Sequence, residues 1–200
     1  MGSQVHDALE KLYKDKMHGK DLTKKQVLDY YEKEWKKNYK DTIKITKKEY
    51  TQNNYKKQGQ TYIEEYYDSY HPFNQLKILG LETSNFLKLG SNTYSVRIDK
   101  LAHKDDTYYI CDYKTNSAML EQDKADKDRQ LAMYCLWVKQ KYPDAKKIVL
   151  LWHMLKFGKE VTSTRTNEEL KALRKETIGK INEIVTCKEF LPNITRLCDW

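Results

Sequence analysis

An Asp-x-Lys sequence lies in the middle of the chain, where Asp112, Tyr113 and Lys114 end an apolar segment that begins near Tyr108. Side chains alternate between the two faces of a β-strand, so Asp112 and Lys114 are expected on one face and Tyr113 on the other. A carboxylate and an ammonium group would then lie side by side. Such a pair can be an ordinary surface ion pair worth well under about 1 kcal/mol, or it can belong to a catalytic centre.

A second carboxylate, Asp99, follows the alternating residues Tyr94, Val96 and Ile98, thirteen positions before Asp112. If this segment is the neighbouring antiparallel strand, the two carboxylates can approach each other, and they repel unless a cation lies between them. Oxygen ligands with one imidazole suit Mg²⁺ or Mn²⁺, and a hydrated ion of this kind can bind a phosphate and polarise the attacking water. The pattern therefore predicts a divalent metal site.

The elements that must position these groups can be predicted from hydrophobic periodicity. After Pro72, three apolar runs of period two predict three short strands in a meander. Residues 130–141 have helical spacing, and residues 147–155 are nearly continuously apolar, as in a strand covered on both faces. A last helix should run from a capping box at Thr166 through Val185. The order helix, three strands, helix, strand, helix indicates an α/β fold with a mixed central sheet flanked by helices.

The first third of the chain is predicted to be helical and basic, with a capping box at Thr23. Between positions 33 and 57 there are nine lysines, three acidic residues and several aromatic residues. Such a segment can be a solvated helix face or a DNA-binding surface. The net charge of +8 favours an anionic partner, with nucleic acid as the leading candidate. Lys44, Lys47 and Lys48 are the candidate substrate-binding residues.

Composition excludes several classes of protein. The chain has 200 residues, 39% hydrophobic and 33% charged, with 4 Trp, 16 Tyr and 4 Phe, which is too aromatic for a disordered chain. The longest apolar run, residues 148–155, is far shorter than a membrane span, and the N-terminus has no signal-peptide core. The four cysteines have no metal-binding or disulfide-framework spacing, so we expect a reducing cytoplasm and no membrane association.

Five short motifs in a fixed order resemble those of the PD-(D/E)xK nuclease superfamily, and within it the RecB-like branch. This branch includes the RecB and AddB nuclease domains and CRISPR-associated adaptation nucleases. The motifs are a histidine motif at His6, an acidic residue at Glu82, Arg-Ile-Asp ending at Asp99, Asp-x-Lys at 112–114, and Gln-x-x-x-Tyr from Gln130 to Tyr134. The resemblance implies a restriction-endonuclease-like core with an additional N-terminal helical, basic region.

The resemblance also implies metal ligands. His6, Asp99 and Asp112 would bind the metal through their side chains, and Tyr113 through its backbone carbonyl. Lys114 would orient or help deprotonate the attacking water and counter the negative charge that grows on the phosphate. A lone histidine on an apolar helix face is otherwise more often an ordinary core residue.

Three further residues follow from the same resemblance. Gln130 and Tyr134, one helical turn apart, would steady Lys114 or contact the substrate backbone. Glu82 would be either the ligand of a second metal ion or a structural acid. Tyr134 could equally be a core residue at helical spacing.

The function implied is hydrolysis of DNA phosphodiester bonds at Mg²⁺ or Mn²⁺, most simply by an exonuclease of recombination, repair, or CRISPR or phage DNA processing. We expect residues 1–200 to form one nuclease domain: 1–70 with the histidine motif, 71–160 with the catalytic sheet, and 161–200 with the last helix. One alternative is a catalytically silent DNA-binding module in a helicase or integration complex. Another is a basic scaffold protein, which would show no dependence on divalent metal.

The C-terminal segment, residues 190–200, resembles the start of the cysteine cluster that closes iron–sulfur members of this branch. Cys198 has no suitable partners in Cys187, Cys111 and Cys135, so a complete four-thiolate site is not expected here. An iron–sulfur cluster would then exist only in a longer parent protein. A complete short protein with a free cysteine is the alternative.

Overall fold

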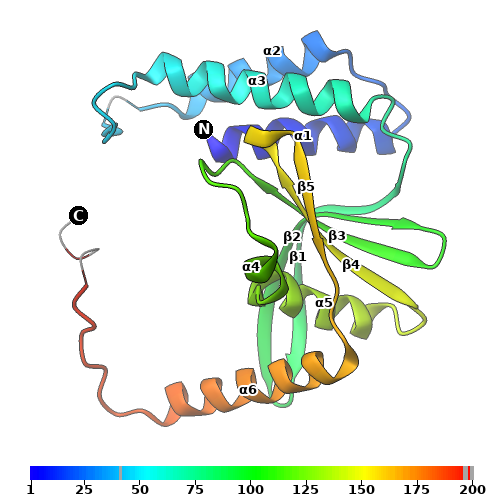
Figure 1. The fold of residues 1–200 in the computed structure, drawn as a ribbon, viewed down its shortest axis with the longest axis vertical. Coiled ribbons are helices and arrows are strands. Elements are labelled where there is room, and N and C mark those ends of the chain that lie inside the picture. The colour runs from blue at the N-terminus through cyan, green and yellow to red at the C-terminus, as the bar shows by residue number, and fades with distance from the viewer. Residues whose placement is uncertain (41, 196–197, 199–200) are drawn as a thin grey trace.

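The computed structural model describes residues 1–40, 42–195 and 198, and Figure 1 shows its arrangement. Within these residues one mixed sheet has the strand order β1-β2-β3-β4-β5. Strands β3 and β4 are parallel, and the other neighbouring pairs are antiparallel. The strands are β1 (Lys77–Leu89), β2 (Asn92–Lys104), β3 (Thr107–Lys114), β4 (Lys147–Met154) and β5 (Lys159–Ser163). The predicted α/β fold with a mixed sheet flanked by helices is confirmed.

Helices lie on both sides of the sheet. At one end of the molecule in Figure 1, α1 (Gly2–Met17), α2 (Lys24–Asn38) and α3 (Gln52–Tyr70) form a helical layer. On the other side lie the short α4 (Gln122–Asp126), α5 (Arg129–Lys141) and α6 (Asn167–Thr186), and a single 3₁₀ turn follows β4 at Leu155–Phe157. Among the described residues, no helix is long and apolar enough to cross a membrane.

Local sequence explains where the helices begin. Thr23, Thr51 and Thr166 each accept a hydrogen bond from a backbone N–H of the first turn, in reciprocal capping boxes. The boxes predicted at Thr23 and Thr166 are confirmed. The box at Thr51 uses Asn54, and it separates α3 from the preceding loop.

The sheet contributes to two hydrophobic cores. Ile98 and Ile110 pack with α5 and α6 residues in the first core, whereas Tyr113 belongs to the second core, with Val5 and Ile63 of the helical layer. Strand alternation therefore directs β3 side chains into both cores, as predicted for Tyr113. The strand predicted at 147–155 is confirmed as β4 (Lys147–Met154), in which every residue after Lys147 is buried.

Two parts of the structure differ from the expectations. Strand β5 was not predicted, because its five residues alternate only weakly and just two of them, Val161 and Ser163, are buried. Of the predicted cysteine-containing tail, residues 196, 197, 199 and 200 lie outside the described part of the chain. Cys111 and Cys135 are buried, whereas Cys187 and Cys198 are exposed.

Helices α2 and α3 approach closely at Gly59. A methyl group added there would lie 2.1 Å from the Oη of the fully buried Tyr31. We expect Gly59→Ala to lower the free energy of unfolding by about 1–3 kcal/mol, because the tyrosine has no room to move. Gly179→Ala in α6 is a matched control, since nothing lies within 4 Å of its added methyl group. It should stabilise by about 0.5–1 kcal/mol. Urea unfolding of both variants measures this, and an equal effect would contradict the close packing.

Candidate active site

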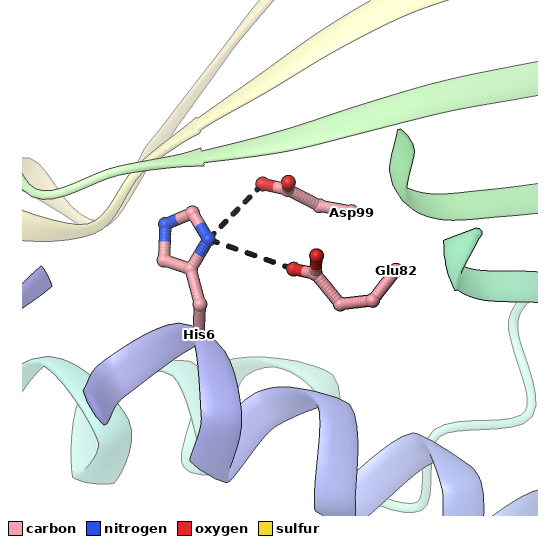
Figure 2. A group of neighbouring side chains, drawn as sticks. All are labelled: His6, Glu82 and Asp99. Atoms are coloured by element: carbon pink, nitrogen blue, oxygen red, sulfur yellow. Dashed lines mark ion pairs between the residues drawn. The ribbon is translucent and has the colours of Figure 1, made fainter. Parts of the chain in front are cut away.

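Three side chains from distant parts of the sequence meet where α1 crosses the sheet. His6 Nδ1 lies 3.3 Å from Asp99 Oδ2 and 3.9 Å from Glu82 Oε1 (Figure 2). One potential ligand atom from each residue lies within 4.8 Å of the others. This spacing and chemistry suit one small cation.

The two acids face each other because of how β1 and β2 pair. Glu82 and Asp99 lie opposite each other in the antiparallel ladder. The pairs Leu81–Lys100 and Thr83–Ile98 flank them on either side. Glu82 has a φ of 44°, in the left-handed region that residues other than glycine rarely adopt. Strain of this kind persists only where the surrounding structure holds it, and it is common at functional sites. Arg97 Nε donates a 2.8 Å hydrogen bond to Glu82 Oε2, which fixes the carboxylate.

The orientation of His6 is set by its other ring nitrogen. His6 Nε2 lies 2.8 Å from the carbonyl oxygen of Tyr113, so Nε2 donates and Nδ1 faces the carboxylates. Burial lowers the pKa of His6, but hydrogen bonding to Glu82 and the charge of Asp99 outweigh it, and the net shift is upward. The position between the acids therefore favours a positive charge, whether on a protonated imidazole or on a cation.

The carboxylate of the Asp-x-Lys motif, Asp112, is more buried than a residue of an open cleft would be, with 7% of its surface exposed. Its Oδ2 lies 2.7 Å from Lys114 Nζ. Burial raises the pKa of Asp112 to about 6, Lys114 opposes this shift, and Asp99 adds to it. The same Oδ2 has no well-directed hydrogen bond from any described residue. A buried carboxylate oxygen in this state is suited to binding a metal ion.

The negative charge of Asp99 is also partly compensated by neighbouring groups. It accepts a 3.0 Å hydrogen bond from the backbone N–H of Tyr113. Burial raises its pKa, and the charge of His6 opposes the rise. Tyr113 thus offers its N–H to Asp99 and its carbonyl to His6, which brings the predicted backbone ligand to the same place as two predicted side-chain ligands.

The structure groups the predicted ligands in a slightly different way from the sequence analysis. Glu82, assigned there as either a ligand or a structural acid, belongs to the tightest group, together with His6 and Asp99. Asp112 lies outside that group, yet its charge interacts with both His6 and Asp99. Its ligand role remains a prediction, as do the others.

Gln130 and Tyr134 are predicted to steady Lys114 or to contact the substrate backbone, and in the structure they contact each other. Gln130 Nε2 donates a 3.1 Å hydrogen bond to Tyr134 Oη, so the two residues pair with each other rather than with Lys114. Tyr134 is largely buried in the core, and burial raises its pKa, to which the nearby charge of Asp112 adds. Tyr134 therefore approaches the centre from the α5 side.

The three candidate DNA-binding lysines are not on a helix face. Lys44, Lys47 and Lys48 are exposed in the loop between α2 and α3. Lys47 Nζ lies 4.9 Å above the ring of Tyr50. The loop leaves all three ammonium groups accessible to a phosphate backbone.

A buried lysine beside the centre was missed. Lys100, next to Asp99 in β2, is 2% exposed, and its Nζ donates to Tyr66 Oη at 3.0 Å and Tyr13 Oη at 3.3 Å. Burial acts to lower its pKa, but Tyr113 and the other nearby groups outweigh this effect and raise it. The only sequence signal was the high tyrosine content, which does not indicate where the rings meet.

The family match agrees with this description. A family model, the PD-(D/E)XK nuclease superfamily, matches residues 1–200. No curated protein matches the sequence. Among solved structures, the chain is similar to the "Putative exonuclease" of Eubacterium rectale, with a TM-score of 0.46 and 10% sequence identity. That match covers 98% of this chain and 77% of the other.

The raised pKa of Asp112 has a consequence for stability. Its pKa rises from 3.8 to about 6, so the folded protein binds a proton there more tightly than the unfolded chain does. The ionised carboxylate then destabilises the metal-free fold above pH 6 and has no effect below about pH 4. We expect Asp112→Asn to raise the free energy of unfolding by up to about 3 kcal/mol at pH 8 in EDTA, and the gain to vanish near pH 4.

Urea unfolding at several pH values measures this difference. Asp106→Asn is the control, because Asp106 is fully exposed and Lys146 lowers its pKa. It should give no gain at pH 8. A loss of stability in Asp112→Asn at pH 8 would mean that the ion pair with Lys114 outweighs the burial of the carboxylate.

Proposed function

The chain belongs to the PD-(D/E)XK nuclease superfamily, and we propose that it is a divalent-metal-dependent DNA nuclease of the RecB-like branch. One observation carries the proposal: His6 meets the carbonyl of Tyr113, 107 positions away, together with Asp99. The histidine motif and the Arg-Ile-Asp motif thus meet at the Asp-x-Lys motif. A basic scaffold would have no reason to hold a buried and a half-buried carboxylate side by side.

We assign the metal to His6, Asp99, Asp112 and the carbonyl of Tyr113. The buried carboxylate of Asp112, together with the imidazole of His6 and the carboxylate of Asp99, supports Mg²⁺ or Mn²⁺ at this place. When bound, such an ion supplies Lewis-acid polarisation of a phosphate and a more acidic water. Glu82, whose carboxylate contacts Arg97 and faces His6, would orient the imidazole.

Lys114 is the proposed catalytic cation of the chain itself. Its ammonium group is partly exposed and is held 2.7 Å from Asp112 Oδ2, which leaves further N–H bonds free to orient a water molecule. It would also stabilise the negative charge that develops on the phosphate. Gln130 and Tyr134 would steady this side of the centre from α5.

DNA is the proposed substrate. The net charge of +8 and the exposed Lys44, Lys47 and Lys48 suit a polyanion whose binding weakens with salt. We propose residues 1–200 as one nuclease domain that cuts from DNA ends in cytoplasmic recombination, repair or CRISPR or phage DNA processing. A helicase or adaptation protein is a candidate partner.

Cleavage of labelled DNA tests the function. We expect activity with Mn²⁺ or Mg²⁺ and none in EDTA, and Lys114→Ala should lower the rate at least about 100-fold, because it removes a charge that stabilises the transition state. Lys147→Ala is a matched control, since Lys147 pairs with Thr107 at the opposite end of β3. A nearly unchanged rate in Lys114→Ala would refute the assignment. An inactive wild type that still binds DNA would be the silent module.

The role of His6 can be tested by titrating Mn²⁺ into the protein by calorimetry. His6→Ala should lower Mn²⁺ affinity at least about tenfold, because a ligand is lost. In wild type the affinity should fall as pH drops, since the upward-shifted pKa of His6 lets protons compete with the metal, and this part of the dependence should be absent from the variant. His103→Ala, in β2, is the control. Equal affinities in His6→Ala and wild type would make His6 a structural residue.

A further inference from the structure

The β1–β2 hairpin has one covered face and one open face. Its covered face carries Leu87, Leu89, Val96 and Ile98, which are fully buried in the core formed with α5 and α6. The β1–β2 hairpin extends away from the helical layer toward α6 (Figure 1). The open face carries the six exposed residues Ser84, Phe86, Lys88, Thr93, Ser95 and Arg97.

The open face is continuous with the candidate active site. Alternation along β2 places Arg97 on the same face as Asp99. The hydrogen bond from Arg97 to Glu82 joins this face directly to the acids. Phe86 lies four residues beyond Glu82, roughly 13 Å along the strand, which is about the length of four stacked nucleotides.

Phe86 is 67% exposed, and its cross-strand partner is the small Ser95. A single exposed apolar residue is ordinary. The surroundings of this ring are more informative, because the open face contains two cations, Lys88 and Arg97, and none of its six residues is acidic. A flat ring between cationic groups is the arrangement that binds unpaired nucleotides, with a base on the ring and phosphates on the cations.

A shallow recess of about 380 Å³ lies beside the ring, between β1 and α5. Phe86, Trp137 and Lys141 contribute to its walls. The recess lies at the β1 edge of the sheet, on the side that α5 covers, so it borders the open face without being part of it.

We propose that the open face of the β1–β2 hairpin binds single-stranded DNA leading to the active site, and that Phe86 stacks on one of its bases. This inference rests on the proposed function for its choice of DNA. In a duplex the bases are already stacked on one another, so a blunt duplex offers Phe86 no free base. The face therefore selects an unpaired strand over a paired one.

Binding without metal tests the proposal separately from catalysis. In EDTA, fluorescence anisotropy with a labelled single-stranded oligonucleotide should show about 5- to 150-fold weaker binding for Phe86→Ala, the range that loss of one base stack produces. Phe86→Trp should retain binding. Phe157→Ala removes another exposed phenylalanine, in the 3₁₀ turn after β4, and should change nothing. Binding of a blunt duplex should be the same in Phe86→Ala and wild type.

Three outcomes would overturn the inference: unchanged single-strand binding in Phe86→Ala, an equal loss for the duplex, or no single-strand binding by wild type. Hydrolysis of thymidine 5′-(p-nitrophenyl phosphate) with Mn²⁺ by the wild type reports on the active site alone. If wild type binds single strands through Phe86 but hydrolyses neither this ester nor DNA, the nuclease proposal fails and the binding face stands.

Discussion

Buried negative charge at the junction of β1, β2 and β3 is the constraint on which the rest of this structure depends. Asp99 and Asp112 are both held where burial raises their pKa values, so the fold must supply compensating positive charge or hydrogen-bond donors. It does so from two directions. Helix α1 brings the imidazole of His6, and β3 brings Lys114 together with the backbone N–H of Tyr113. The helical layer is thus part of the centre and not an appendage to the sheet.

A buried positive charge, that of Lys100, also supports the junction. Lys100, the residue after Asp99, extends into a cluster of tyrosine rings, with its Nζ 4.3 Å from the centre of the Tyr13 ring and 5.4 Å from that of Tyr113. The ring of Tyr113 stacks on His153, while its carbonyl meets His6. Tyr113 therefore connects the packing of α1, α3 and β4 to the proposed metal ligands. A change in this cluster would move the carbonyl and the imidazole together.

The sequence was sufficient where local rules decide the outcome. Period-two alternation predicted that Tyr113 points away from Asp112 and Lys114, and the capping box at Thr166 predicted the start of α6. The sequence was insufficient where an unusual backbone conformation or a tertiary contact determines the position of a residue. The position of Glu82 depends on a left-handed φ and on its place opposite Asp99, which no residue pattern indicates. Lys100 would be expected at the surface, because lysine is almost never fully buried unless it is paired.

Because this centre requires positive charge, proton binding, metal binding and substrate binding affect one another there. A proton on His6 and a metal ion both neutralise the acids, so they compete, and the acids raise the pKa of His6. Arg97 extends this competition to the hairpin, because its exposed guanidinium is bound to Glu82 and also borders the proposed binding face. A phosphate that draws Arg97 away leaves Glu82 with less positive charge around it. The negative potential at His6 then increases, so DNA bound on the hairpin would strengthen cation binding at the centre.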